Sequence, residues 1–147
     1  ERVRLFGVNL AFSANFPAEA DSVRIARRLR RLGVNLVRLH HMDTQPDANP
    51  ANANSILTTG PYPTLNPIAV TRLRAFLDAL KAEGIYVNLN LKVGYVFRPG
   101  VDGIPALPGG ALIGDQSKPL HMIWPRMIEL QAQFAGDVID ALSVAAD

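Results

Sequence analysis

Strand-like and helix-like segments alternate along this chain, and that alternation constrains the fold more than any other feature. Apolar strand-like segments lie at residues 5–10, 35–40 and 85–93, and amphipathic helical segments follow them at about 19–32, 66–83 and 125–142. The turns from helix back to strand are short and carry Gly33 and Gly84, whereas long loops at 41–66 and 94–119 lead from strand to helix. This pattern predicts a parallel α/β sheet wrapped by helices, with ligands at the carboxyl ends of the strands.

Each helical segment has an apolar stripe at helical spacing, which predicts its buried face. The expected stripes are Ile25, Leu29 and Leu32 in the first helix, Val70, Leu73, Leu77 and Leu80 in the second, and Met127, Leu130, Phe134, Val138 and Ala141 in the last. Asn66 followed by Pro67 is typical of a helix start, and Gly33 is typical of a left-handed helix end.

Composition narrows the class of protein. The chain has 147 residues, of which 48% are hydrophobic, so we expect one domain with a real core over residues 1–147. No apolar run approaches the roughly 18 residues of a membrane span, and the charged start predicts no uncleaved signal peptide. The absence of cysteine excludes a disulfide scaffold and a thiolate zinc site.

The positive charge is concentrated in one helical segment. The net charge is +2, and five of the 15 cations are Arg24, Arg27, Arg28, Arg30 and Arg31. Such a run is typical of a solvated helix face, and no aromatic side chains alternate with it as a nucleic-acid groove would require. We therefore expect no nucleic-acid partner and no membrane partner.

The third strand-like segment alternates strictly between apolar and polar residues. Asn88, Asn90 and Lys92 alternate with valines and leucines over residues 87–93, so one face of the strand is polar. A buried polar face is costly in a parallel sheet that helices cover on both sides. A barrel interior resolves this cost, so we expect a (β/α)8 TIM barrel, of which this chain supplies about three βα units.

The other two strands extend the same polar face. Val37 and Leu39 should point to the helices, as should Phe6, Val8 and Leu10 of the first strand. The side chains expected to converge on one upper interior are Asn9, Arg38, His40, Asn90 and Lys92. A satisfied polar plug is the alternative interpretation of this convergence.

Histidines and aromatic residues lie at the strand ends and in the long loops. His40 and His41 are adjacent, so on a continuing strand they point to opposite faces and cannot share a metal ion. We expect them to bond a ligand or the backbone, with no metal bound. Tyr95 and Trp124 either cover the barrel mouth or form stacking surfaces for a ligand.

The residues that carry these features resemble those of the amino-terminal half of a cellulase-type barrel, glycoside hydrolase family 5 and its clan A relatives. The resemblance rests on Gly7-Val8-Asn9, on residues 32–43 (LGVNLVRLHHMD) and on residues 84–91 (GIYVNLNL), and the segment 125–134 adds to it. It implies a retaining glycoside hydrolase that acts on a β-linked polysaccharide, endoglucanase- or mannanase-like, without a cofactor. It also implies an extracellular or periplasmic location.

The resemblance also assigns roles to individual residues. Arg38 would support the nucleophilic glutamate through a hydrogen bond. The residues expected to bind substrate are Asn9, His40, His41, Asp43, Asn90, Lys92, Tyr95 and Trp124. Many relatives carry a histidine where this chain has Lys92, so a fixed positive charge replaces a neutral hydrogen-bonding ring on that side of the site.

The catalytic carboxyl pair of such an enzyme is missing from the expected positions. Retaining glycosidases need two carboxyl groups about 5–5.5 Å apart, and the family places these glutamates at the ends of its fourth and seventh strands. The four glutamates here are terminal or helical, and Asp43, Asp102 and Asp115 form no convincing pair. We therefore expect both catalytic glutamates outside this chain, on the remaining half of the barrel, and the segment alone to be inactive.

Two alternatives stay open. The chain could be a non-catalytic carbohydrate-binding or structural half-barrel that assembles with another copy or a partner. It could also be an unrelated lyase or aldolase with Lys92 as the reactive amine, although Asn88 and Asn90 make the surroundings of that amine polar.

Overall fold

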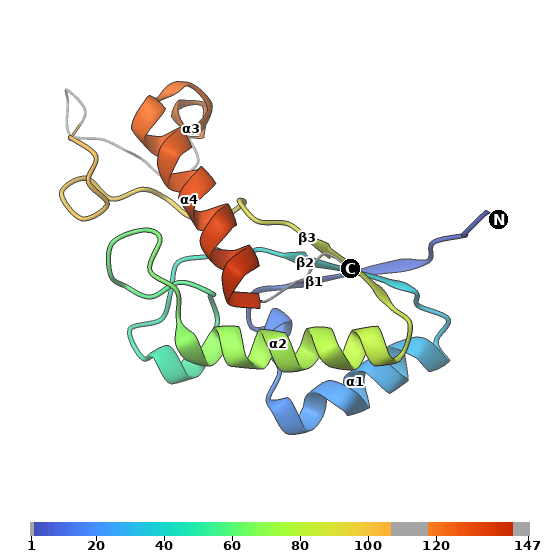
Figure 1. Ribbon diagram of the computed structural model, residues 1–147. Helices are drawn as coiled ribbons and strands as arrows, with labels where there is room; N and C mark the ends of the chain where they lie inside the picture. Colours follow the sequence, from blue (N-terminus) through green and yellow to red (C-terminus); the bar gives the residue numbers. More distant parts are fainter. Residues whose placement is uncertain (1, 107–117, 143–147) are drawn as a thin grey trace.

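The computed structural model describes residues 2–106 and 118–142, and it shows an α/β protein with a three-stranded parallel sheet and four helices (Figure 1). In chain order, the elements are β1 (Gly7–Ala11), the 3-10 helix η1 (Phe12–Asn15), α1 (Glu19–Arg31), β2 (Leu36–His40), the 3-10 helix η2 (Pro50–Asn52), α2 (Pro67–Ala82), β3 (Tyr86–Leu89), α3 (Leu120–Ile123) and α4 (Pro125–Leu142). The part of loop 94–119 at residues 107–117, which includes Asp115, lies outside the described residues, as do residue 1 and residues 143–147.

The sheet has the order β1-β2-β3, and both pairs of neighbours are parallel. The predicted order of strands and helices along the chain is therefore confirmed. The third strand is shorter than expected, because it ends at Leu89 and not at Val93. After Asn90, whose N–H still bonds the carbonyl of Leu39, the backbone turns toward Asp43 and leaves the sheet.

Local sequence signals set the ends of the helices. The side chain of Asn66 accepts from the N–H groups of Ile68 and Ala69, at 3.0 and 3.4 Å, and so caps α2. Gly33 and Gly84 follow α1 and α2 with φ of +83° and +68°, a conformation that glycine adopts without steric cost. The two tight turns that the sequence predicted are thus confirmed.

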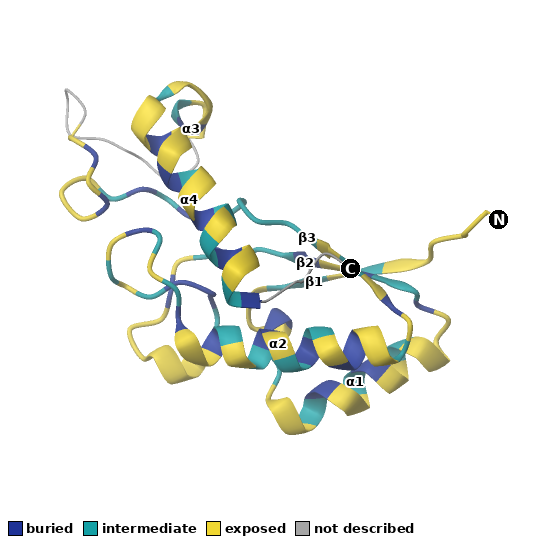
Figure 2. Ribbon diagram, in the orientation of Figure 1, coloured by how far each residue is buried: buried dark blue, intermediate teal, exposed yellow. Residues whose placement is uncertain are grey.

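The core lies between the sheet and the helices. Val37 and Leu39 of β2 are fully buried, whereas Arg38 between them is exposed on the opposite face. Figure 2 shows buried residues along α2 and α4. α1 and α2 pack side by side, and α4 packs on α2 (Figure 1). The buried stripe of α4 is Met127, Leu130, Phe134, Val138 and Leu142.

Two apolar residues expected on buried faces are exposed. Phe6 is 59% exposed because β1 begins only at Gly7. Leu32 is 57% exposed because α1 ends at Arg31, and the small residues Ser22 and Ala26 occupy the buried face of that helix.

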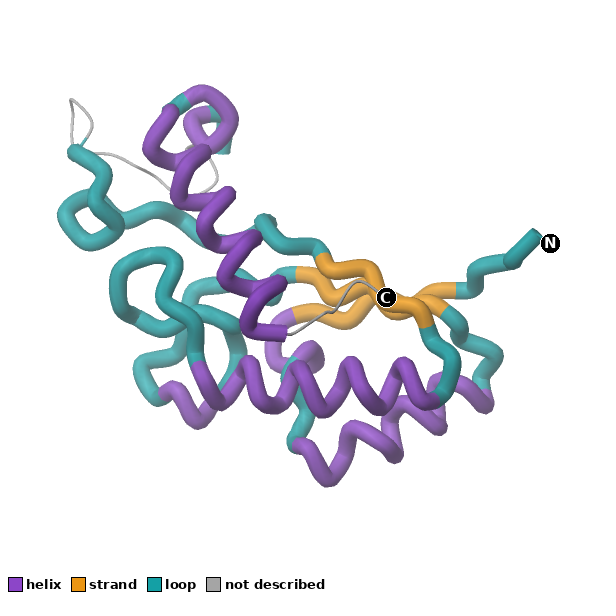
Figure 3. The backbone as a smooth tube through the Cα atoms, in the orientation of Figure 1, coloured by secondary structure: helices purple, strands orange, loops and turns teal. Residues whose placement is uncertain are grey.

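The long loops gather at the carboxyl end of the sheet, and the short helix-to-strand turns lie at the other end (Figure 3). Loop 41–66 contains η2 and an antiparallel bridge between Leu57 and Leu65. Among the described residues, no helix combines the length and the hydropathy that a membrane crossing requires.

Candidate functional site

Ring and amide side chains meet where the three strands end. His40 is the last residue of β2, and its Nδ1 lies 2.9 Å from Nδ2 of Asn90, just beyond β3. The ring of His41 lies against that of His40, with centroids 4.3 Å apart. Phe12, directly after β1, stacks on His41 at 4.9 Å with an interplanar angle of 21°. We call Phe12, His40, His41 and Asn90 the strand-end cluster.

Two members of this cluster have a left-handed backbone. Phe12 has φ of +55° and His41 has φ of +52°. Non-glycine residues in such conformations cost about 1–3 kcal/mol each and persist only where their surroundings hold them. Asn15 provides one such restraint, because its Nδ2 donates to the carbonyl of His40 at 2.7 Å and ties the segment after β1 to the end of β2.

The left-handed turn also decides how the two histidines lie. Because β2 ends at His40, His41 turns its ring against that of His40, so the expectation of opposite faces does not apply. Partial burial, and after it the charges of His41 and Arg38, lower the pKa of His40, and Asp43 opposes this shift. The neutral imidazole is therefore the favoured form of His40. No group of three potential metal ligands occurs in the part of the chain that the structure describes.

Gly94 closes one side of the cluster. A Cβ atom at this position would lie 2.8 Å from Nδ1 of His41, which is closer than packed atoms come. The loop after β3 can therefore pass beside His41 only because residue 94 has no side chain.

The open face of the sheet carries a row of polar side chains beneath the cluster. Asn9, Arg38 and Asn88 are in register across the three strands, and all three are exposed. Arg38 forms no ion pair with any described carboxylate. The structure thus brings Asn9 and Arg38 together on one face and joins His40 to Asn90, as the sequence predicted.

Lys92 does not belong to this row. Since β3 has already ended, Lys92 follows the loop, and its Nζ donates to the carbonyl of Tyr95 at 2.7 Å and lies 3.5 Å from Asp43. Burial lowers its pKa, while Asp43 opposes that shift. The lowered pKa is a feature that the lyase alternative requires, but contacts with the Tyr95 carbonyl and with Asp43 already occupy the amine.

Asp43 is fully buried, and its oxygens are already occupied. The carboxylate accepts the backbone N–H groups of Val93, Gly94 and Tyr95 at 2.8, 2.9 and 3.2 Å. In this structure, Asp43 fixes the loop after β3 to the end of β2 and has no surface to offer a sugar.

A second buried carboxylate, Asp102, fixes the same loop further along. It accepts the N–H groups of Tyr62 and Arg98 at 2.9 and 2.6 Å, and the hydroxyl of Tyr95 at 2.9 Å. The Arg98 guanidinium lies 3.2 Å from it. We call Asp43 and Asp102 the carboxylate anchors.

The two aromatic residues expected to stack on a ligand lie in the core or against it. Tyr95 is 1% exposed and stacks on Tyr62 with ring centroids 4.5 Å apart. Burial, followed by the charge of Asp102, raises the pKa of the Tyr95 hydroxyl. Trp124 ends α3 and is half-buried against the hydrophobic core.

His121 is a buried histidine outside the cluster. Its ring meets Phe97 edge to face at 5.0 Å and holds α3 against the loop after β3. Burial, with Lys92 and Lys118 nearby, lowers the pKa of His121 to about 4.

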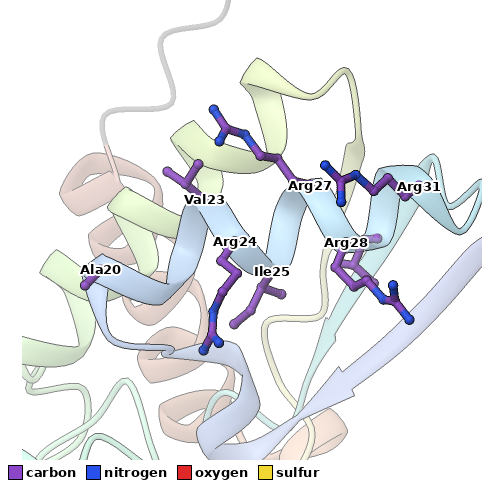
Figure 4. A pocket seen from close by; sticks show the side chains of 8 residues that line it. Ala20, Val23, Arg24, Ile25, Arg27, Arg28 and Arg31 are labelled. Carbon is purple, nitrogen blue, oxygen red and sulfur yellow. The ribbon is translucent and has the colours of Figure 1, made fainter.

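A hollow of about 720 Å³ lies on the outer side of α1 and shares no residue with the strand-end cluster (Figure 4). Its lining is Ala20, Val23, Arg24, Ile25, Arg27, Arg28, Leu29 and Arg31. Arg24 pairs with Asp21 at 2.8 Å and Arg27 lies 3.5 Å from Glu83, so part of this arginine face is neutralised within the chain. The hollow contains no carboxyl or imidazole group that could act as an acid or base.

Sequence reasoning missed Phe12 and Gly94. Phe12 follows the apolar run of the first strand and reads as part of it, and only its φ and its contact with His41 reveal its place. Gly94 follows the third strand directly, which is a weak signal of close backbone approach.

No family model, curated protein or solved structure matches this chain.

Proposed function

We propose that this chain forms part of a (β/α)8 barrel of a retaining glycoside hydrolase that acts on a β-linked polysaccharide. The observation that carries the proposal is the polar open face of the parallel sheet. Arg38 lies there between Asn9 and Asn88, uncovered and without a carboxylate partner among the described residues. Parallel sheets of α/β proteins are covered on both faces, so a polar face fits a closed barrel with an aqueous upper end.

The edges of the sheet support a larger barrel. Within the part of the chain that the structure describes, β1 and β3 each have one neighbour in the sheet, so both can pair with a further strand. The helices lie along the face opposite Arg38, as they do outside a barrel.

Arg38 is the positioning residue in this proposal. A guanidinium inside a barrel is costly unless it meets a carboxylate. The nucleophilic glutamate of a strand outside this chain is the partner we assign to it. Pairing with Arg38 would lower the pKa of that glutamate and keep it ionised.

The distribution of carboxylates favours one second candidate, a non-catalytic carbohydrate-binding half-barrel. Asp43 and Asp102 are buried and bonded to backbone N–H groups, so the described strand ends offer no accessible carboxyl pair. In this candidate, the chain binds glycans and does not hydrolyse them.

The Arg38→Lys variant of the protein with its completed barrel tests the main proposal. Lysine keeps the charge and loses the two-pronged contact, so turnover on glucan, mannan or xylan should fall at least about tenfold. The acidic limb of the pH–rate profile should move to higher pH as the pKa of the nucleophile relaxes upward.

Arg28→Lys is the matched control, because Arg28 is exposed on α1, away from the strand ends. Unchanged turnover and an unmoved acidic limb in Arg38→Lys would reduce Arg38 to a structural residue. Glycan binding without hydrolysis by the wild-type protein would favour the second candidate.

A further inference from the structure

We infer that Phe12 is a stacking platform for a pyranose ring, an inference that rests on the proposed function and adds a binding residue to it. Phe12 is 48% exposed at the carboxyl end of β1, where the long loops gather. A large apolar ring that is half exposed beside polar side chains suits a ligand with one apolar face and polar edges.

The backbone at Phe12 is evidence that its position serves more than packing. An L-residue at φ of +55° is strained, and glycine would occupy this position without that strain. Phe12 does not offset the strain by burial, since the residue is 48% exposed to solvent. Strained residues that their surroundings hold in place are concentrated at binding and catalytic sites.

The ring is also held in a fixed orientation. One of its faces is stacked on His41, which in turn lies edge-on to His40, and His40 bonds Asn90. Asn15 joins the segment after Phe12 to the carbonyl of His40. The Phe12 ring is therefore connected to the ends of all three strands. Because the ring is already fixed, less conformational entropy is lost when a ligand binds to it.

The chemistry around the platform selects a neutral polyhydroxylated ligand. The groups joined to it are an imidazole pair and an amide, from His40, His41 and Asn90, and the carboxylate of Asp43 is buried and bonded to backbone N–H groups. Amides and imidazoles donate to and accept from hydroxyl groups. The C–H face of a β-linked pyranose would lie on the Phe12 ring, with its hydroxyls toward these groups.

Titration of the protein with its completed barrel with the hexasaccharides of β-1,4-glucan, β-1,4-mannan and β-1,4-xylan, followed by calorimetry and by NMR, tests the inference. We expect one of them to bind and to shift the signals of Phe12 and His41. Phe12→Ala should raise Kd about three- to tenfold, whereas Phe12→Tyr should leave Kd within about twofold. Phe6→Ala is the matched control, because Phe6 is exposed to a similar degree at the opposite end of the same strand and should leave Kd unchanged.

Phe12→Gly separates binding from folding. Glycine relieves the strain at this φ, so the variant should melt no lower than Phe12→Ala while binding as weakly as that variant. A Phe12→Gly chain that fails to fold would make Phe12 a structural residue and overturn the inference. The same conclusion follows if Phe12→Ala raises Kd no more than Phe6→Ala does.

The proposed function fails in a distinguishable way. If the wild-type protein with its completed barrel binds none of the three hexasaccharides, the carbohydrate assignment is lost and the inference is lost with it. If the wild-type protein binds one of them and the Phe12 variants bind it equally well, the carbohydrate assignment stands and the platform alone is wrong.

Discussion

The strand-end cluster and the carboxylate anchors occupy the same end of the sheet and are built in opposite ways. The cluster is partly exposed, carries two left-handed residues and leaves Arg38 below it without an ion-pair partner in the described chain. The anchors are buried, and backbone N–H groups surround their oxygens. The strand-end cluster is strained and exposes its side chains to a ligand. The carboxylate anchors hold the adjacent loop rigid, which keeps the strained cluster in place. If this contrast is correct, substitutions in the anchors reduce stability most, and substitutions in the cluster reduce binding.

The largest expected effect is on Asp43. In Asp43→Asn, an amide NH2 faces backbone N–H groups and Lys92 loses its counter-charge. We expect the free energy of unfolding to fall by about 3–5 kcal/mol, as when one partner of a buried ion pair is removed. Urea unfolding of Asp43→Asn and of the wild-type protein measures this loss of free energy. Asp140→Asn, at an exposed site on α4, should change stability by less than about 0.5 kcal/mol, and equal effects of the two variants would remove the distinction.

His121, which lies near the carboxylate anchor Asp43, makes the stability of the fold depend on pH. The unfolded chain binds this proton near pH 6.5, and the folded chain only near pH 4, so unfolding takes up a proton in between. Stability should therefore fall as the pH drops from 6.5 to 4, by at most about 3 kcal/mol. Denaturant unfolding across this range measures the slope. His121→Gln should reduce this slope, and a slope unchanged in His121→Gln would contradict the assignment.

Two stacked tyrosines give a smaller, paired effect. The hydroxyl of Tyr95 bonds Asp102, so Tyr95→Phe should lower the free energy of unfolding by about 1.5–3 kcal/mol. The hydroxyl of Tyr62 is buried and has no hydrogen-bond partner among the described residues. Tyr62→Phe should therefore leave stability unchanged or raise it. Thermal melting of the pair tests this, and equal losses would show that the anchor bond adds nothing.

The smallest expected effect compares two glycines. Gly94→Ala places a Cβ against His41, so we expect a loss of about 1 kcal/mol, with NMR shifts concentrated on His41 and Phe12. Gly136 lies in α4 with open space around it, and Gly136→Ala should gain about 0.5–1 kcal/mol. A Gly94→Ala chain with unshifted His41 signals would mean that the cluster is looser than its contacts indicate.

The fold was largely predictable because its signals are local and repeated. The apolar stripe of α4, the Asn66 cap and the two glycine turns follow from spacing and backbone chemistry, and the structure confirms them, except that Leu142 and not Ala141 is the buried residue at the end of α4. The parallel α/β sheet follows from the order of these elements. The extent of β3 was not predictable from the alternation of residues 87–93, because Asp43, fifty residues earlier, draws the backbone out of the sheet.

The site was predicted only in part, for the same reason. His40, Asn90, Asn9 and Arg38 are placed by strand geometry, which the pattern of alternation reveals. The burial of Asp43 and Tyr95 depends on contacts between the two long loops, and such contacts leave no periodicity in the sequence. The φ of Phe12 and His41 is likewise a product of tertiary packing and not of residue type.

The strand order β1-β2-β3 matches the order of the strands in the chain, and this has a consequence for how the protein is made. Each strand can pair with the one before it as it leaves the ribosome, because no strand has to wait for a later one to separate it from its neighbour. Pairing β1 with β2 closes a loop of about thirty residues, and pairing β2 with β3 closes one of about fifty. The entropy costs of closing these two loops differ little. The ring pair of Phe12 and His41 can form early during synthesis, whereas the bonds of His40 to Asn90 and of Asp43 to the residues after β3 must wait until about residue 95 has emerged. Until then the strand-end cluster lacks the bond of His40 to Asn90, and synthesis of the third strand completes it.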